Sequence, residues 1–234
     1  MYGLSSVLFT TEGREDALLA AMKAYAEGIS RDPDLVYVDC HQSKYPYKFV
    51  LIEMYGDRHS LARQEATEHG RAWAAAKKEL LTSESTFTPA WPMLTEPKNC
   101  ARPYENHQDV PAAELTCLTD DPEIVCGVYV RVFPKPHRLD YLIPAIHRAN
   151  RRILDNEPGF GFIDFMMTSD PGEMIVVEYY KSREYLSIHH EMQHTQIFGL
   201  ERKVEAFERQ KHQAFTMRPI FSMGRFPRRF KARS

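Results

Sequence analysis

The first third of this chain contains several short apolar runs and one segment whose apolar residues recur at helical spacing. Runs rich in Val, Ile, Tyr and Phe occupy residues 3–11, 34–42 and 47–55 and predict strands. A second helix is expected over about residues 58–81, and a last, Pro-interrupted edge or irregular strand over 86–94. The first helix is predicted from apolar residues at helical spacing: Leu18, Leu19, Met22, Tyr25, Ala26 and Ile29. The order is β-α-β-β-α-β, the ferredoxin-like motif.

The same pattern returns when 125 is added to each position. Val7 then meets Val132, Tyr55 meets Tyr180 and His69 meets His194. Helices are predicted around residues 143–154 and 183–207, and strands at residues 126–134, 159–168, 173–180 and 213–223. One offset without gaps indicates a tandem duplication of one small module.

The first predicted helix of each copy ends at three residues that disfavour a helix: an acid, a proline and a turn residue. They read Asp32-Pro33-Asp34 and Glu157-Pro158-Gly159, and proline cannot continue a helix. We therefore predict an α+β protein with a first module over residues 1–95 and a second over residues 126–223. The Pro-rich stretch 96–125 is expected to be a linker, and the basic stretch 224–234 a tail.

Composition narrows the class of protein. The 234 residues are 43% hydrophobic and 26% charged, with a net charge of −2, so no global field favours nucleic acid or a membrane surface. No long apolar run, basic leader or Cys-x-x-Cys pair is present in the sequence. No nucleotide-binding glycine motif occurs either. We expect a cytoplasmic protein without nucleic-acid or membrane partners.

A formal H-E-x-x-H match spans His190 to His194. On a helix, residues four apart share a face, so both histidines could reach one zinc ion. The chain lacks the extension of the larger peptidase motif, because Ile197 stands where that motif has glycine. The repeat partner is Glu65-Ala66-Thr67-Glu68-His69, in which only the second histidine survives. A zinc peptidase is therefore disfavoured.

Three histidines are expected to face the interior of the second module. His190 and His194 fall in the apolar stripe of its second predicted helix, and His147 lies on the inward face of its first. Two interpretations stay open, an acid–base set or a ligand set for Zn, Fe or Cu. The acid–base reading is preferred because no carboxylate or thiolate clearly completes a metal site. Glu53 and Glu178, which close equivalent strands, are interpreted as structural.

The chain resembles a tandem member of the antibiotic-biosynthesis-monooxygenase superfamily. The resemblance rests on the element order, on the helix-ending Glu157-Pro158-Gly159, and on a strand ending in Glu and an aromatic residue before a His-bearing helix. It implies that two ferredoxin-like modules pair through their sheets as a dimeric α+β barrel, here within one chain. It also implies a ligand pocket between each sheet and its helices. The family includes cofactor-independent oxygenases, cyclases, haem-degrading enzymes and binding modules, so it indicates a fold more strongly than a reaction.

The resemblance implies a cofactor-independent monooxygenase that acts on an activated aromatic, polyketide-type substrate with molecular oxygen. The second module is expected to be the active one, with His194 as the base and His147 or His190 as its partner. The expected pocket residues are Tyr180, Phe162, Phe198, His69, Trp73 and Tyr55. A cofactor-free cyclase or isomerase and a non-catalytic ligand-binding barrel are the alternatives. A His–metal enzyme, a haem-degrading enzyme and a zinc peptidase are weaker ones, and association into a homodimer stays open.

Overall fold

The protein is described from a computed structural model. The described ranges are residues 2–92, 126–135, 159–170, 172–193 and 213–224. Single positions between and beside them are also described: residues 138, 142, 145, 146, 149, 152, 153, 156, 157 and 195.

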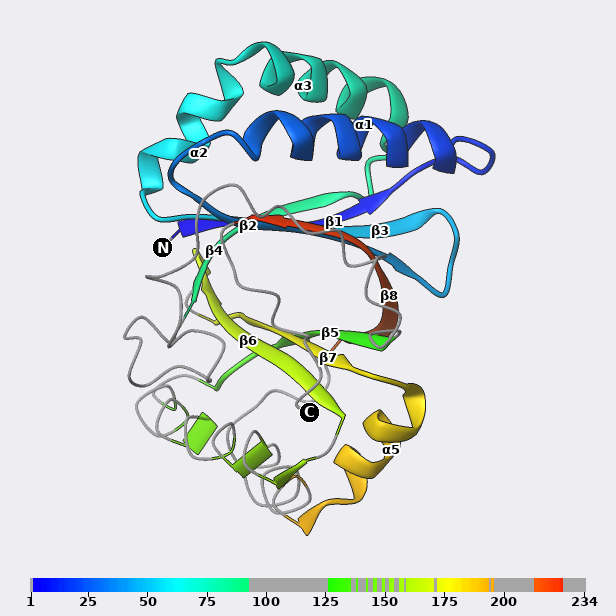
Figure 1. Ribbon diagram of the computed structural model, residues 1–234, viewed down its shortest axis with the longest axis vertical. Helices are drawn as coiled ribbons and strands as arrows, with labels where there is room; N and C mark the ends of the chain where they lie inside the picture. Colours follow the sequence, from blue (N-terminus) through cyan, green and yellow to red (C-terminus); the bar gives the residue numbers. More distant parts are fainter. Residues whose placement is uncertain are drawn as a thin grey trace. The chain divides into compact units, whose positions relative to one another are not determined.

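The first unit contains residues 2–91 together with residues 217–224. Three helices cover one face of its sheet (Figure 1): α1 (Glu15–Ile29), α2 (Arg58–Glu65) and α3 (Glu68–Leu80). The sheet is built from β1 (Tyr2–Phe9), β2 (Leu35–Ser43), β3 (Lys48–Tyr55) and β4 (Thr86–Pro92). β1 pairs antiparallel with both β3 and β4, and β3 pairs with β2, which gives the ferredoxin-like order β4-β1-β3-β2.

The second unit repeats this plan. Its strands are β5 (Cys126–Val132), β6 (Phe160–Thr168) and β7 (Met174–Tyr180), followed by α5 (Arg183–Glu191). β7 pairs antiparallel with both β5 and β6, as β3 does with β1 and β2. β8 (Gln213–Gly224) is divided between the units at Met217. The eight strands follow the order β1-β3-β2-β8-β5-β7-β6-β4 and close into a barrel, so the predicted α+β barrel fold is confirmed.

The proline in the last strand predicts an edge or irregular strand, and the structure has a paired strand with an irregularity. Residues 217–224 of β8 hydrogen-bond along β2 inside the first unit, from Met217 opposite Ser43 to Gly224 opposite Tyr37. The register shifts between Cys40 and His41, beside Pro219. A bulge at this point lets a proline, which has no N–H to donate, sit within a paired strand.

The long second helix predicted for each module is wrong, because it is broken at an equivalent position in both. In the first module Thr67 takes an extended conformation, and its side chain accepts a hydrogen bond from Gly70 N as the cap of α3. In the second module α5 ends at Glu191 and Met192 has φ −63° and ψ 136°, outside the helical region. Thr67 and Met192 are separated by the repeat offset of 125.

The core of the first unit lies between its helices and its sheet. The apolar stripe predicted for α1 is confirmed, since Leu18, Met22, Tyr25, Ala26 and Ile29 are all buried. They pack in one cluster with strand residues such as Phe49 and Phe221. Within the described residues, no helix is long and apolar enough to cross a membrane.

Candidate functional site

A buried acid–histidine pair joins two elements of the second module. Glu157 ends the first helical segment, and His189 lies on α5. His189 Nδ1 is 2.8 Å from Glu157 Oε2 and 3.0 Å from Oε1, and the two side chains are only 6% and 3% exposed. The hydroxyl of Thr195 lies 3.5 Å from the same nitrogen. Within the described residues, the hydrogen bonds of the ring are all made at Nδ1, so a carboxylate holds this side of the ring.

Local sequence explains why these two side chains meet. Gly159 has φ +72°, a conformation that favours glycine, and a Cβ there would meet the Tyr185 ring at 2.3 Å. The chain can therefore turn tightly after Glu157 and approach α5. Ser182 caps the start of α5 by accepting a hydrogen bond from Tyr185 N. This cap and turn bring the first turn of α5 against the end of the preceding helical segment.

A second acid lies close to this pair. The hydroxyl of Tyr180, at the end of β7, donates a 2.9 Å hydrogen bond to Glu178 Oε2. The rings of Tyr180 and His189 are 5.4 Å apart and tilted by 50°. Burial and the nearby carboxylates of Glu178 and Glu157 raise the pKa of Tyr180 far above its ordinary value. Tyr180 is therefore a proton-bearing hydroxyl beside the acid–histidine pair.

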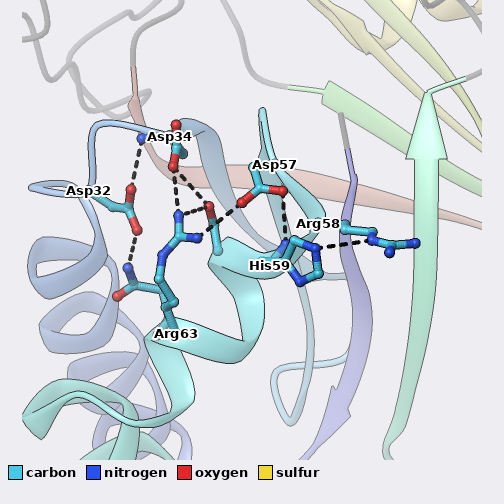
Figure 2. A network of polar contacts seen from close by, with 8 residues as sticks. Asp32, Asp34, Asp57, Arg58, His59 and Arg63 are labelled. Atoms are coloured by element: carbon cyan, nitrogen blue, oxygen red, sulfur yellow. Dashed lines mark hydrogen bonds and ion pairs between the residues drawn. The ribbon is translucent and has the colours of Figure 1, made fainter.

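The first module carries the same layout with a different chemistry. At the offset of 125, Asp32 stands for Glu157 and Gln64 for His189, and Gln64 Nε2 donates to Asp32 Oδ2. Figure 2 shows this region, where Arg63 also pairs with Asp34 at 2.6 Å and Asp57 at 3.0 Å. An amide cannot exchange a proton near neutral pH. The first module keeps the hydrogen bond to the acid but has an amide where the second module has the imidazole of His189.

A buried carboxyl group also distinguishes the first module. Glu53 Oε2 accepts hydrogen bonds from Tyr25 at 2.7 Å and from Tyr55 at 2.8 Å. Burial raises the pKa of Glu53, and the two tyrosine hydroxyls partly oppose this rise. The ring of Trp73 stacks on Tyr25 with centroids 5.6 Å apart. His69 donates from Nε2 to Gln64 Oε1 over 2.7 Å, so these residues form one packed cluster.

The predicted site residues lie in different parts of the structure, and some fall outside the described residues. Tyr180 lies at the acid–histidine pair, and Tyr55, Trp73 and His69 lie in the packed cluster of the first module. His190 is exposed on α5, so the expectation that it faces inward is wrong. His189 and His190 fall on either side of the apolar stripe, and the turn at Gly159 brings Glu157 to His189. His147, His194 and Phe198 lie outside the described residues, as does the side chain of Phe162.

The H-E-x-x-H match does not lie on one continuous helix. Met192 leaves the helical conformation, so the uninterrupted helix on which the four-residue spacing rests ends at Glu191. No group of three His, Cys, Asp or Glu side chains that could hold a metal ion is found in the described part of the chain. The helical geometry that a zinc peptidase motif requires is missing here.

Sequence reasoning missed His189 and Glu157 as a pair. The repeat contained a usable signal, because Asp32 with Glu157 and Gln64 with His189 are both pairs at the common offset. The first position is acidic in both copies. The second is an amide in one copy and an imidazole in the other, and both groups can donate to an acid. The two positions together indicate a hydrogen bond shared by both modules. Because Gln64 is equivalent to His189, a hydrogen bond between Asp32 and Gln64 points to His189 rather than to His190.

Comparison with known proteins identifies the second module. Residues 126–198, which include Glu157, Tyr180 and His189, match the family described as Antibiotic biosynthesis monooxygenase. We refer to this stretch, by that match, as the antibiotic biosynthesis monooxygenase (ABM) domain. The resemblance drawn from the sequence is thus confirmed. No curated protein matches the chain in sequence.

Solved structures extend the likeness beyond the ABM domain to nearly the whole chain. A candidate monooxygenase from Lactobacillus acidophilus NCFM has a TM-score of 0.69 at 12% identity, covering 94% of this chain and 98% of its own. One from Fusobacterium nucleatum subsp. nucleatum has a TM-score of 0.72 at 9% identity, covering 96% and 94%. An anthrone oxidase-like protein has a TM-score of 0.61 at 10% identity, covering 99% and 96%. At these identities the likeness establishes the fold alone.

Proposed function

We propose that this protein is a cofactor-independent monooxygenase that oxidises a small, activated aromatic compound in its ABM domain. The observation that carries the proposal is the buried Glu157–His189 pair, in which the carboxylate engages Nδ1. A carboxylate at one ring nitrogen sets the tautomer so that the other nitrogen can accept a proton. The family match and the solved monooxygenase-like folds add support.

The proposed chemistry needs one base and a substrate that can itself reduce oxygen. His189 Nε2 takes a proton from the acidic carbon or hydroxyl of a phenol or anthrone. The resulting electron-rich anion supplies the electrons to molecular oxygen. One oxygen atom enters the product, and the other leaves as water with the two hydrogens removed from the substrate. Glu157 stabilises the imidazolium, and the hydroxyl of Tyr180, which donates to Glu178, stays protonated beside the pair.

The decisive variant is His189→Gln, which copies the residue that the first module already has at this position. Gln64 shows that an amide can keep the hydrogen bond to the facing acid. We expect oxygen uptake with an anthrone substrate to fall by about 100-fold or more, because a positioned base contributes factors of this order. Circular dichroism should be unchanged. The matched control is His190→Gln on the adjacent, exposed position, which should keep its activity.

Three results would count against the proposal in different ways. Unchanged oxygen uptake by His189→Gln would move the base to another residue. Turnover of the substrate without oxygen consumption would favour a cyclase or isomerase, which needs the same proton transfer. Binding of the substrate without any turnover would favour a ligand-binding barrel.

A further inference from the structure

A hollow is lined by residues at the turn from α3 into β4 in the first unit, on elements that the proposed reaction does not use. Figure 1 shows the course of the chain through this turn. The hollow has a volume of about 450 Å³, and it is a shallow depression that is wide open to solvent. It is lined by one short stretch of chain and its neighbours: Ala74, Lys77, Lys78, Leu81, Thr82, Ser83, Ser85 and Phe87. Its lining combines cations, hydroxyl groups and apolar surface.

Two lysines supply the positive charge of the hollow. Lys77 Nζ lies 5.0 Å from the centroid of the Phe87 ring and 5.8 Å from that of Trp73. The neighbouring Lys78 is exposed. Within the described residues, neither ammonium group forms an ion pair. The nearby acid Glu79 is held by Arg14 at 2.5 Å, so this acid is already neutralised by another partner.

The remaining lining residues suit a ring and a polar atom. Phe87 is 41% exposed, one of three large apolar side chains with such exposure in the described part of the chain. Leu81 and Ala74 add apolar surface beside it. The hydroxyl oxygen of Thr82 is buried without a hydrogen-bond partner, whereas Ser85 already exchanges hydrogen bonds with the backbone of Phe9. That oxygen of Thr82 is closed off from solvent, so a ligand in the hollow would reach the hydroxyl only after the side chain turns outward.

We propose that this hollow binds a small aromatic anion, a carboxylate or phenolate carried on one or two fused rings. The anion lies near Lys77 and Lys78, and the ring lies against Phe87 and Leu81. A simple inorganic anion would leave the phenyl surface unused, and a neutral ring would leave both ammonium groups unpaired. This inference does not rest on the proposed oxygenation, because it concerns the first unit and a group of residues separate from His189.

Titration of the intact protein with 2-naphthoate tests this site by calorimetry. Two further probes separate its parts: acetate has only the charge, and 2-naphthalenemethanol has only the ring. We expect 2-naphthoate to bind at least about ten-fold more tightly than either, because charge and ring contacts both contribute. Raising the salt concentration should weaken 2-naphthoate and leave the alcohol unchanged. Equal affinity for 2-naphthoate and the alcohol, or no binding of 2-naphthoate, would overturn the proposal.

Variants locate the binding. Lys77→Gln with Lys78→Gln should weaken 2-naphthoate by about ten-fold or more, and Phe87→Ala should weaken both aromatic probes. The charge-matched control is Lys23→Gln on the exposed face of α1, which should bind normally. His189→Gln should also bind normally. Loss of binding in His189→Gln, together with full binding in the double lysine variant, would place the probe in the ABM domain and reject a site at the end of α3.

Discussion

Glu53 is the residue on which the packing of the first module depends most directly. Its carboxyl group is 2% exposed and receives both tyrosine hydroxyls on one oxygen. Burial of an unpaired carboxylate would be costly, so these two donors are what make the position tolerable. Among the described residues of the second module, Tyr180, the equivalent of Tyr55, donates to Glu178 in the same way. The acid is therefore part of the packed core as Glu53 in the first module. As Glu178 in the second, it lies near the Glu157–His189 pair.

Glu53→Gln should change how stability depends on pH. Burial raises the pKa of Glu53 above its ordinary value of 4.5, so the folded state holds the proton more tightly than the unfolded chain. Stability therefore falls as pH rises from the unfolded pKa through the folded pKa. We expect the unchanged protein to lose stability relative to Glu53→Gln in this window, by up to about 1.4 kcal/mol per pH unit.

Urea denaturation between about pH 5 and pH 8 measures this difference. Glu84→Gln removes an equal charge from the exposed loop before β4, and its difference from the unchanged protein should stay flat. If the Glu53→Gln difference also stays flat, Glu53 ionises as it does in the unfolded chain.

Sequence could predict a histidine at the second-module site but not which one. Periodicity places His189 and His190 on either side of the apolar stripe, and only the turn at Gly159 selects His189 by bringing Glu157 to it. Glu53 was correctly given a structural role, but its two tyrosine partners lie on α1 and β3. Periodicity cannot pair hydroxyls with a carboxyl group across two elements.

At the scale of elements, the repeat predicts most of the architecture. The strands follow from continuous apolar runs, which are buried on both faces in β3 and β7. The stripe on α1 follows from its one buried face. The helix breaks at Thr67 and Met192 escaped prediction, since apolar residues continue on both sides and threonine is an acceptable helix residue. The pairing of β8 with β2 was not predicted either. Its pattern predicts a strand but does not specify which neighbour it pairs with.

Phe221→Ala tests the position of β8. Phe221 belongs to the second repeat in sequence, but it is 2% exposed within the core of the first unit. We expect a loss of about 3–5 kcal/mol, as for other buried phenylalanines cut to alanine. Hydrogen exchange should show the loss in amides of β2 and β3 first, because these strands share that core.

Phe215→Ala on the same strand is the matched comparison. Phe215 stacks on Tyr129 with centroids 5.2 Å apart, inside the second unit. Its truncation should speed exchange in β5 and β7 instead. Identical exchange patterns for the two variants would show that the units do not open separately.

For the whole molecule, one chain supplies all eight strands of the closed barrel. Completion of the barrel therefore requires no second copy. We expect the unfolding midpoint to be independent of protein concentration, because a stability that depends on association rises with concentration. Thermal unfolding over a hundred-fold dilution series, about the span needed to resolve a shift, measures this. A midpoint that rises with concentration would reveal that a homodimer forms the stable unit.

The pairing of residues 217–224 with β2 has a consequence for how the protein is made. Translation delivers the first module long before the strand that completes its sheet. Until β8 emerges from the ribosome, β2 presents a row of open backbone groups, the kind of edge on which other chains can pair. The nascent protein thus passes through a stage in which its own later sequence competes with neighbouring polypeptides for that edge. Slow synthesis of residues 126–216 would lengthen this stage, so the yield of folded protein should be sensitive to the pace of translation and to chaperones that shield a strand.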